Sequence, residues 1–183
     1  VTMADIALLA AQGSHVVHCP ASNMKLASGI APVQALLDAG VNVALGTDGA
    51  ASNNKLDMFA EMRLASLLAK VATGNAANVP AAQALQMATL GGARALGLDA
   101  SIGTLEVGKL ADIVAVDLDG VATSPVYDPV SHLVHAAGRE CVTDVWVGGA
   151  RIVAERVLQT VDTHTLLHRT RTWQRKLAST PSP

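Results

Sequence analysis

Asp48 is the residue of this chain whose setting points most directly to chemistry. It lies in the motif GTDG and follows the apolar run VNVAL at residues 41–45, in which larger and smaller side chains alternate. The alternation predicts a short buried strand, so the carboxylate should lie at the carboxyl end of that strand. A carboxylate there could bind a metal ion or act as a general base. An aspartate beside a glycine also commonly caps a helix or closes a turn, so its position alone leaves both roles open.

Three more polar side chains lie near this position in the expected order of elements. His18 ends a short apolar strand predicted at residues 14–19, Asn23 falls in the polar loop expected after that strand, and Ser52 falls in the loop after Asp48. Each could face a bound substrate. Short polar side chains in loops often satisfy their own backbone instead, which is the structural alternative.

The elements that must hold these side chains alternate between helix and strand. Apolar periodicity and its end signals predict helices at residues 2–13, 32–39, 55–72 and 80–90, and strands at residues 14–19 and 41–45. Thr2 and Asp5 form a capping pair for the first helix. Asn53 or Asn54 is expected to cap the long helix, and the Gly91-Gly92 pair to interrupt the last one.

The pattern changes to short strands after residue 101. Strands are predicted at residues 110–116, 144–147 and 150–153, and Gly148-Gly149 between the last two is a strong hairpin signal.

His132 and His135, three apart on a predicted helix, could bind a metal, but no carboxylate follows at a matching offset and a structural role is favoured. A basic amphipathic helix is predicted at residues 164–176, with Leu166, Leu167, Trp173 and Leu177 as its packing side.

Composition excludes several classes of partner. Half of the 183 residues are apolar, and 13 basic against 15 acidic side chains give a net charge of −2, so we expect no nucleic acid partner. No segment approaches the ~20 apolar residues of a membrane span, so we expect no membrane partner either. The two cysteines form no disulfide framework and no C-x-x-C pair, which favours a cytoplasmic location.

Three motifs in a consistent order resemble signatures of the amidohydrolase superfamily. They are HCPASNMKLASG at residues 18–29, PVQALLDAGVNVALGTDGAASNN at residues 32–54 and GTLEVGKLADIVAVD at residues 103–117. They are most similar to the branch that contains 5-methylthioadenosine/S-adenosylhomocysteine deaminases, guanine deaminases and triazine hydrolases. The resemblance implies an α/β fold, namely the C-terminal part of a (β/α)8 metal-dependent hydrolase barrel plus part of an appended β-sandwich.

The resemblance also implies a division of the chain. Residues 1–100 would form the C-terminal portion of the barrel with its strands seven and eight, residues 101–160 part of the composite sandwich, and residues 161–183 a helix and tail. A complete barrel takes about 250 residues. The chain has no initiator methionine and opens on a helical pattern, so we expect a C-terminal piece whose missing N-terminal part is its partner.

By resemblance, Asp48 corresponds to the aspartate that binds the catalytic metal after strand eight. It would also accept the proton as water attacks the amine- or halide-bearing carbon of the substrate ring. His18, Asn23 and Ser52 are expected to join Asp48 in contacting the substrate, and His18 is not ordinarily a metal ligand in this family. The resemblance implies one divalent metal, zinc or alternatively iron, whose remaining ligands lie upstream of this chain.

The expected function is therefore that of a metal-dependent hydrolytic deaminase. Its substrate would be an adenine-type purine nucleoside of the 5-methylthioadenosine/S-adenosylhomocysteine class. The alternatives are a guanine deaminase, a triazine chlorohydrolase or a non-catalytic scaffold of the same superfamily, and the oligomeric state stays open. With one metal ligand of several, the chain by itself is expected to be inactive.

Overall fold

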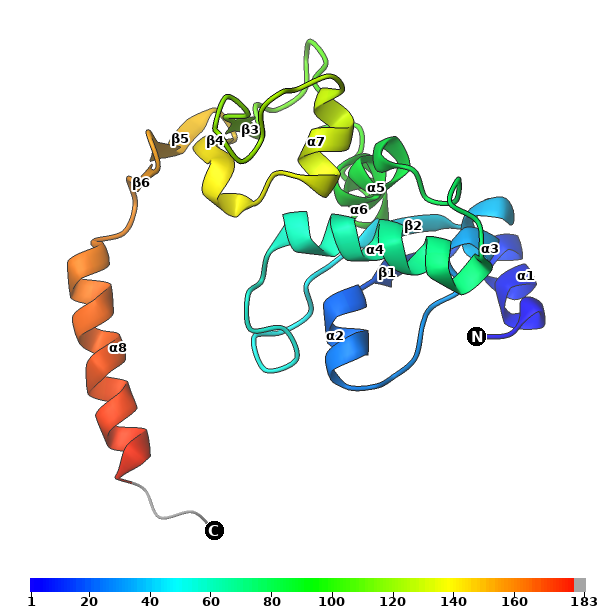
Figure 1. Ribbon diagram of the computed structural model, residues 1–183, viewed down its shortest axis with the longest axis horizontal. Coiled ribbons are helices and arrows are strands. Elements are labelled where there is room, and N and C mark those ends of the chain that lie inside the picture. The colour runs from blue at the N-terminus through cyan, green and yellow to red at the C-terminus, as the bar shows by residue number, and fades with distance from the viewer. Residues whose placement is uncertain (180–183) are drawn as a thin grey trace.

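A pair of parallel strands covered by helices forms the first part of the chain. A computed structural model describes residues 1–179. The elements of this part are α1 (Met3–Ala11), β1 (His15–His18), α2 (Pro20–Lys25), α3 (Val33–Asp38), β2 (Asn42–Leu45), α4 (Met58–Thr73), α5 (Ala81–Ala88) and α6 (Leu90–Ala95). Strand β1 pairs with β2 in parallel, and α4 crosses in front of the pair in Figure 1. The predicted strands and the Thr2–Asp5 capping box of α1 are confirmed.

An antiparallel sheet forms the second part. Its elements are β3 (Ile113–Val116), α7 (Pro129–His135), the 3-10 turn Arg139–Cys141, β4 (Val142–Val147), β5 (Ala150–Ala154), β6 (Val157–Leu158) and α8 (Thr163–Ala178). The strands lie in the order β3-β4-β5-β6. Gly148 and Gly149 connect β4 to β5 with φ of +55° and +83°, so the predicted two-residue hairpin is confirmed. The proposed domain boundaries stay a prediction.

Helix α8 extends away from the rest of the molecule in Figure 1. The apolar side chains predicted as its packing side, namely Leu166, Leu167, Trp173 and Leu177, are all exposed. No residue of α8 is buried, so the predicted packing is not met by any contact within residues 1–179. The end of the predicted tail, residues 180–183, lies outside the described residues.

The segment after β1 differs from its prediction. It was expected to be a loop, but residues Pro20–Lys25 form helix α2. Pro20 occupies the first turn, where its missing N–H and fixed φ suit a helix start. The proline therefore ends the strand and also begins a helix.

The start of α4 differs as well. Asp57 caps this helix, since its Oδ1 accepts hydrogen bonds from the backbone N–H groups of Phe59 and Ala60, so the prediction of Asn53 or Asn54 was wrong. Leu56 precedes the cap with a φ of +48° and lies outside the helix. The helix therefore starts later than its apolar pattern, because an aspartate acceptor was available closer to it.

The Gly91-Gly92 pair does not interrupt a helix, contrary to the prediction. The interruption is at Thr89, with φ −118° and ψ −91°, and both Gly91 and Gly92 lie inside α6. At Gly91, a Cβ atom would come within 2.7 Å of the carbonyl oxygen of Val43. This glycine is therefore present because α6 approaches the backbone of β2 closely.

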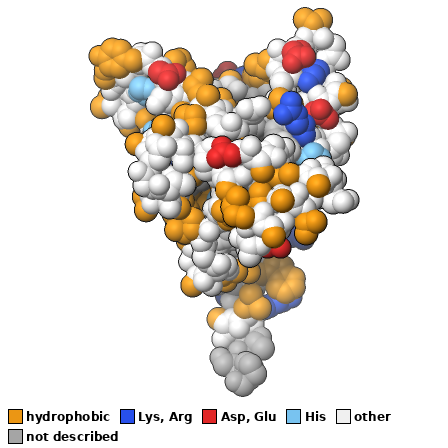
Figure 2. All heavy atoms as spheres, turned by 90° about the vertical axis from the view of Figure 1, so that its right-hand side faces the viewer, with side chains coloured by type: hydrophobic (Ala, Val, Ile, Leu, Met, Phe, Trp, Pro, Cys, Tyr) orange, Lys and Arg blue, Asp and Glu red, His pale blue; other side chains and the backbone are white. Residues whose placement is uncertain are grey.

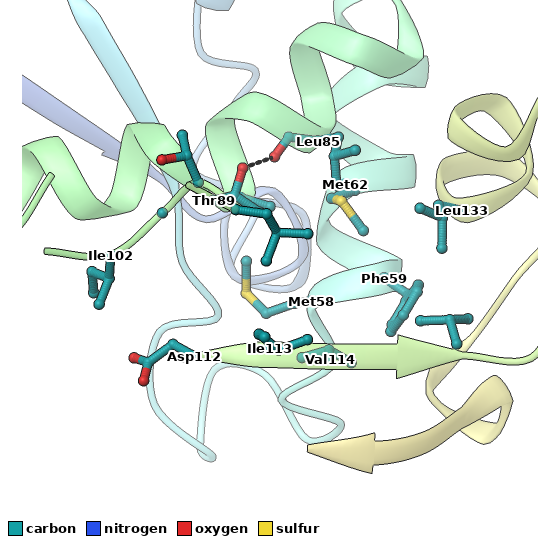
Figure 3. A pocket seen from close by; sticks show the side chains of 15 residues that line it. Met58, Phe59, Met62, Leu85, Thr89, Ile102, Asp112, Ile113, Val114 and Leu133 are labelled. Carbon is teal, nitrogen blue, oxygen red and sulfur yellow. Dashed lines mark hydrogen bonds between the residues drawn. The ribbon is translucent and has the colours of Figure 1, made fainter. Parts of the chain in front are cut away.

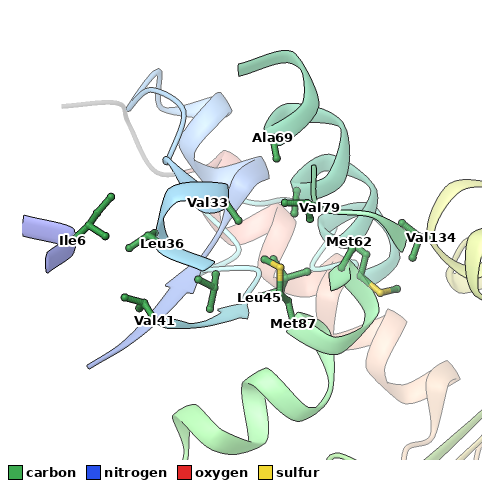
Figure 4. Close-up of a cluster of buried hydrophobic side chains, with 13 residues drawn as sticks. Ile6, Val33, Leu36, Val41, Leu45, Met62, Ala69, Val79, Met87 and Val134 are labelled. Atoms are coloured by element: carbon green, nitrogen blue, oxygen red, sulfur yellow. The ribbon is translucent and has the colours of Figure 1, made fainter. Parts of the chain in front are cut away.

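The hydrophobic core surrounds β2, as Figure 4 shows. Val43, Ala44 and Leu45 are consecutive and all buried, which is typical of a parallel strand covered on both faces. The cluster comprises Ile6, Val33, Leu36, Val41, Val43, Leu45, Met62, Ala65, Ala69, Val79, Ala84, Met87 and Val134. Because α1, α3, α4, α5 and α7 all contribute to it, the end of β2 is fixed from several sides.

One arginine joins the two parts of the chain. Arg63 on α4 donates from Nε to the carbonyl oxygen of Val134 at 3.2 Å and from Nη2 to that of Ala137 at 2.7 Å. These carbonyls lie at the C-terminal end of α7, where helix carbonyls need outside donors. Arg63 thus holds α7 against α4.

The surface mixes apolar and polar side chains. Seen from the side of α1 and α3, Figure 2 shows apolar side chains scattered among uncharged ones, with few charges. Helix α1 exposes Met3 and Leu8 on its outer side. Among residues 1–179, no helix is both long enough and apolar enough to cross a lipid bilayer.

The two glycines of α6 provide a matched pair of substitutions. Gly91→Ala should lower the free energy of unfolding by about 1–3 kcal/mol, because the new methyl group meets the backbone of β2. Gly92→Ala meets no atom within 4 Å and should raise it by about 0.5–1 kcal/mol through helix propensity. Urea unfolding of the two variants measures both values, and equal effects would contradict the close packing of α6 on β2.

Candidate functional site

Asp48 lies at the edge where both parallel strands end. The ladder aligns His18 with Leu45, and the N–H of Gly46 donates to the carbonyl oxygen of His18 at 3.0 Å. The chain then turns at Asp48, whose φ of +60° lies in the left-handed region that aspartate tolerates better than most residues. The position of Asp48 just after the strand is as predicted from the sequence, and the residue is exposed there.

Two serine hydroxyls hold one oxygen of this carboxylate. The Oγ of Ser22, on α2, donates to Oδ2 of Asp48 at 2.7 Å, and the Oγ of Ser52 donates to the same atom at 2.6 Å. The serines are only 4% and 9% exposed. Ser52 was predicted as a site residue, whereas Ser22 was not. Neither hydroxyl contacts Oδ1, which leaves that oxygen to other partners.

These hydrogen bonds favour the ionised form of Asp48. The Ser52 hydroxyl, then the Ser22 hydroxyl, and then the N–H of Gly49 hold the pKa of Asp48 below its ordinary value of 3.8. Donors to a carboxylate stabilise its ionised form. Asp48 is therefore an anion near neutral pH, which a metal ligand of this type must be.

His18 is buried at the end of β1. Its side chain is 4% exposed, and burial lowers its pKa from 6.5 to about 4, so the ring is neutral near pH 7. The side chain lies at the same strand edge as Asp48, but the described residues include no hydrogen bond between the two. Its contact with a substrate stays a prediction.

Asn23 directly follows Ser22 on α2. It is half-buried, and its side-chain amide makes no hydrogen bond to any residue in the range 1–179. Its backbone N–H donates to the carbonyl oxygen of Cys19, which fixes its place in the helix. The amide therefore has both donors and its acceptor available, and its role in binding stays a prediction.

A buried glutamate lies behind the site. Glu61 on α4 is 1% exposed, and its Oε2 accepts from the N–H of Ala21 at 3.1 Å. Its Oε1 accepts from Nδ2 of Asn53 at 2.7 Å. Burial raises the pKa of Glu61, while these two hydrogen bonds oppose the rise.

Lys25, on α2, forms another connection between α2 and the loop that follows Asp48. Its Nζ donates to the carbonyl oxygen of Ala51 and to Oδ1 of Asn54, both at 2.7 Å. Ser22, Lys25 and Glu61 were all missed as site residues from the sequence. One signal in the sequence could have indicated Glu61, namely a charged side chain among the apolar residues Met58, Met62 and Ala65 on the inner face of α4.

A cavity of about 560 Å³ lies elsewhere, between α4, α5, α7 and β3. Its lining is largely apolar and includes Met58, Phe59, Met62, Leu85 and Leu133, as Figure 3 shows. None of the predicted site residues lines it. The polar cluster at Asp48, and not this cavity, is therefore the candidate site.

The described residues fit a metal only as one ligand of a larger set. Asp48 is ionised, exposed and oriented by two hydroxyls, as a metal-binding carboxylate should be. Within residues 1–179, no group of three or more His, Cys, Asp or Glu side chains could hold a metal ion. His132 and His135 lie on α7, and the structural role favoured for them stays a prediction.

Comparisons with known proteins show similar sequences over most of the chain. Residues 1–152 match the sequence model of the amidohydrolase family. A 5-methylthioadenosine/S-adenosylhomocysteine deaminase of Teredinibacter turnerae is 50% identical over 175 residues, which are 96% of this chain and 40% of that protein. The chain spans about 40% of the length of the curated relatives it matches.

Two solved structures extend the similarity to three dimensions. An adenosine deaminase from Xanthomonas campestris with bound zinc has a TM-score of 0.96 at 50% identity, over 98% of this chain and 41% of that one. An atrazine chlorohydrolase from Arthrobacter aurescens complexed with zinc has a TM-score of 0.88 at 32% identity, over 94% of this chain and 38% of that one.

Removing the serine hydroxyls should change the titration of Asp48. In the Ser22→Ala, Ser52→Ala double variant, the pKa of Asp48 should rise toward 3.8, because the two donors that stabilise its anion are lost. Carbon-detected NMR titration of the side-chain carboxyl measures it. Ser28→Ala, at an exposed position of the same segment, is the control, and an unchanged pKa in the double variant would contradict the hydrogen-bond assignment.

Burial of His18 predicts a loss of stability in mild acid. The folded state takes up this proton only near pH 4, whereas the unfolded state takes it up near pH 6.5. The contribution of His18 is complete above about pH 6.5 and falls by about 3 kcal/mol as the pH drops to 4.

Urea unfolding between pH 7 and pH 4 measures this loss. His18→Gln should flatten the pH dependence relative to the unsubstituted chain. His15→Gln, at the exposed start of the same strand, is the matched control. Parallel pH profiles for His18→Gln and the unsubstituted chain would be incompatible with a neutral buried ring.

Proposed function

The chain belongs to the amidohydrolase family, and from that premise we propose that it forms part of the active site of a metal-dependent hydrolytic deaminase. The proposed substrate is an adenine-type purine nucleoside of the 5-methylthioadenosine/S-adenosylhomocysteine class. The 50% identity to a deaminase with that name supports this class. The observation that carries the proposal is the ionised Asp48, held by two hydroxyls at the carboxyl edge of parallel strands.

Asp48 would be one ligand of the metal. Zinc is the proposed ion, because the two similar structures contain it, and iron is the alternative. A divalent ion at this position would supply an acidified water and a positive charge for the transition state. The remaining ligands would come from residues outside this chain.

Asp48 would also move a proton. Hydrolytic deamination consumes one water and replaces the ring C–NH₂ group with C=O. One proton of that water ends on the neighbouring ring nitrogen, and the other, held in transit by Asp48, leaves with the ammonia. Oδ1 is the atom proposed to hold that proton, because Oδ2 already accepts two hydrogen bonds. The lowered pKa makes Asp48 a weak base, so it would take a proton only from a strongly acidified water and would release it readily.

The neighbouring side chains would orient the reactants. Ser22 and Ser52 fix the rotation of the Asp48 carboxylate. His18 and Asn23 are proposed to contact the substrate, the first as a neutral ring and the second through an amide that has no partner among the described residues. Two free cysteines, both half-buried, agree with a proposed cytoplasmic setting.

A triazine chlorohydrolase is the second candidate. The 32% identity to an atrazine chlorohydrolase supports it, and in that case chloride instead of ammonia would leave the ring. The attack of water and the role of Asp48 would be the same. The leaving group therefore distinguishes the two candidates.

The full-length protein that contains this chain should release ammonia from 5′-methylthioadenosine or S-adenosylhomocysteine. A coupled assay for ammonia measures this release, with guanine and atrazine each tested as an alternative substrate. Ammonia from guanine alone would favour a guanine deaminase, and chloride from atrazine alone would favour the chlorohydrolase. No product from any of the four, in protein loaded with zinc, would favour a non-catalytic scaffold.

Asp48→Asn in the same protein should reduce kcat/KM by at least about 100-fold, because the amide is a poor metal ligand and cannot hold the proton. Asparagine tolerates the left-handed backbone at this position, so the loop should keep its shape. The exposed Asp99→Asn is the control. Activity retained above about a tenth of the unsubstituted value would contradict the assignment of Asp48.

A further inference from the structure

The buried carboxylate of Glu61 connects the two segments that carry the serines. One oxygen accepts from the backbone of Ala21 and the other from the side chain of Asn53. Ala21 directly precedes Ser22 in the chain, and Asn53 directly follows Ser52. The two serines in turn donate to the same oxygen of Asp48. Each of these two hydrogen bonds, called here the two arms of Glu61, therefore ends one residue away from a serine whose hydroxyl binds Asp48.

The first arm supplies a cap that α2 lacks. The N-cap residue Cys19 makes no side-chain hydrogen bond to the helix, and Pro20 has no N–H to offer. The N–H of Ala21 is one of the free donors at a helix start, and Glu61 provides its acceptor from 40 residues away. Since Ser22 is the next residue of the same turn, this hydrogen bond restrains the backbone that carries its hydroxyl.

The second arm fixes the loop between Asp48 and α4. Asn53 is 6% exposed, and its Oδ1 accepts from the N–H groups of Lys55 and Leu56 at 3.3 Å each. Its own N–H donates to the carbonyl oxygen of Gly49 at 2.9 Å. The amide is thus held on both sides, and through it Glu61 restrains Ser52.

The carboxylate of Glu61 is costly to bury and also costly to remove. Burying an ionisable group costs free energy, which hydrogen bonds offset. Replacing Glu61 alone by an apolar side chain would leave the N–H of Ala21 and the buried amide of Asn53 without their acceptor. Both oxygens of Glu61 are occupied by N–H donors and the side chain is buried, so Glu61 is not itself placed to bind a metal.

We infer that Glu61 is a positioning residue, whose carboxylate fixes the two serine hydroxyls that hold Oδ2 of Asp48. The inference rests on the proposed function in one respect, namely that Asp48 binds the metal. Glu61 acts on that metal only through Ser22 and Ser52. Its effect should therefore vanish once both hydroxyls have been removed.

Zinc affinity of the full-length protein, measured by competition with a chromophoric chelator, tests this inference. Glu61→Gln keeps the shape of the side chain but turns an NH₂ group toward one of the two donors, which breaks at least one arm. It should weaken zinc binding about 10- to 100-fold, as loss of an outer partner of a metal ligand does. The exposed Glu106→Gln is the matched control and should leave the affinity unchanged.

Non-additivity distinguishes positioning from a general structural effect. The Ser22→Ala, Ser52→Ala double variant should weaken zinc binding to a similar extent, and adding Glu61→Gln should change it by less than about threefold more. Effects that multiply in the triple variant would overturn the inference, as would a Glu61→Gln protein whose zinc affinity matches the unsubstituted one. Should Glu61→Gln fail to fold, Glu61→Asp, which keeps the charge, takes its place. It is compared in the unsubstituted protein and in the double serine variant, under the same criteria.

A metal-free measurement separates this inference from the proposed function. Glu61→Gln should speed amide hydrogen exchange across residues 20–25 and 49–54 in metal-free protein. Asp48→Ala is measured beside it for zinc affinity. If zinc binding is unchanged in Asp48→Ala, the proposed function is wrong. The hydrogen-exchange rates alone then test whether Glu61 fixes the two segments. Unchanged exchange in both segments of Glu61→Gln would then overturn the inference.

Discussion

The parallel ladder between β1 and β2 is the constraint on which the candidate site depends. Because parallel strands end at the same edge, the segments that follow them must lie side by side. One segment carries Ser22 and Lys25, and the other carries Asp48 and Ser52. Every polar contact between the two segments is made possible by this ladder, and the core around β2 fixes its position.

Two carboxylates in this region have opposite environments. Asp48 is exposed and accepts hydroxyl donors, which lower its pKa, whereas Glu61 is buried, which raises its pKa. The same functional group therefore has two uses within a short distance along the chain. One is available to a ligand, and the other is enclosed and organises its surroundings, a division that environment and not residue type determines.

Much of the fold was predictable because its signals are local. The amidohydrolase resemblance and the α/β fold are confirmed by the family match and the similar structures. The Thr2–Asp5 box, the strand before Asp48 and the Gly148-Gly149 hairpin were also predicted correctly, since each depends on a few adjacent residues. The cap of α4 was predicted wrongly because Asp57, a local acceptor closer to the helix, makes it. The break before α6 was predicted wrongly because Gly91 is set by the close approach of α6 to β2, which is a tertiary contact.

The site was predicted less completely, for a physical reason. Asp48 follows from a strand end and a motif, but its partner Ser22 is 26 residues away, and Glu61 is 40 residues from Ala21. No periodicity links such positions, since each pair forms only once the ladder has aligned the two segments. At Asp48 itself, the left-handed backbone costs stability, and it persists because the surrounding hydrogen bonds fix it. At this residue the position of the carboxylate has therefore been favoured over the stability of the backbone. The buried polar contacts behind Asp48 are the part of the structure that makes this cost tolerable.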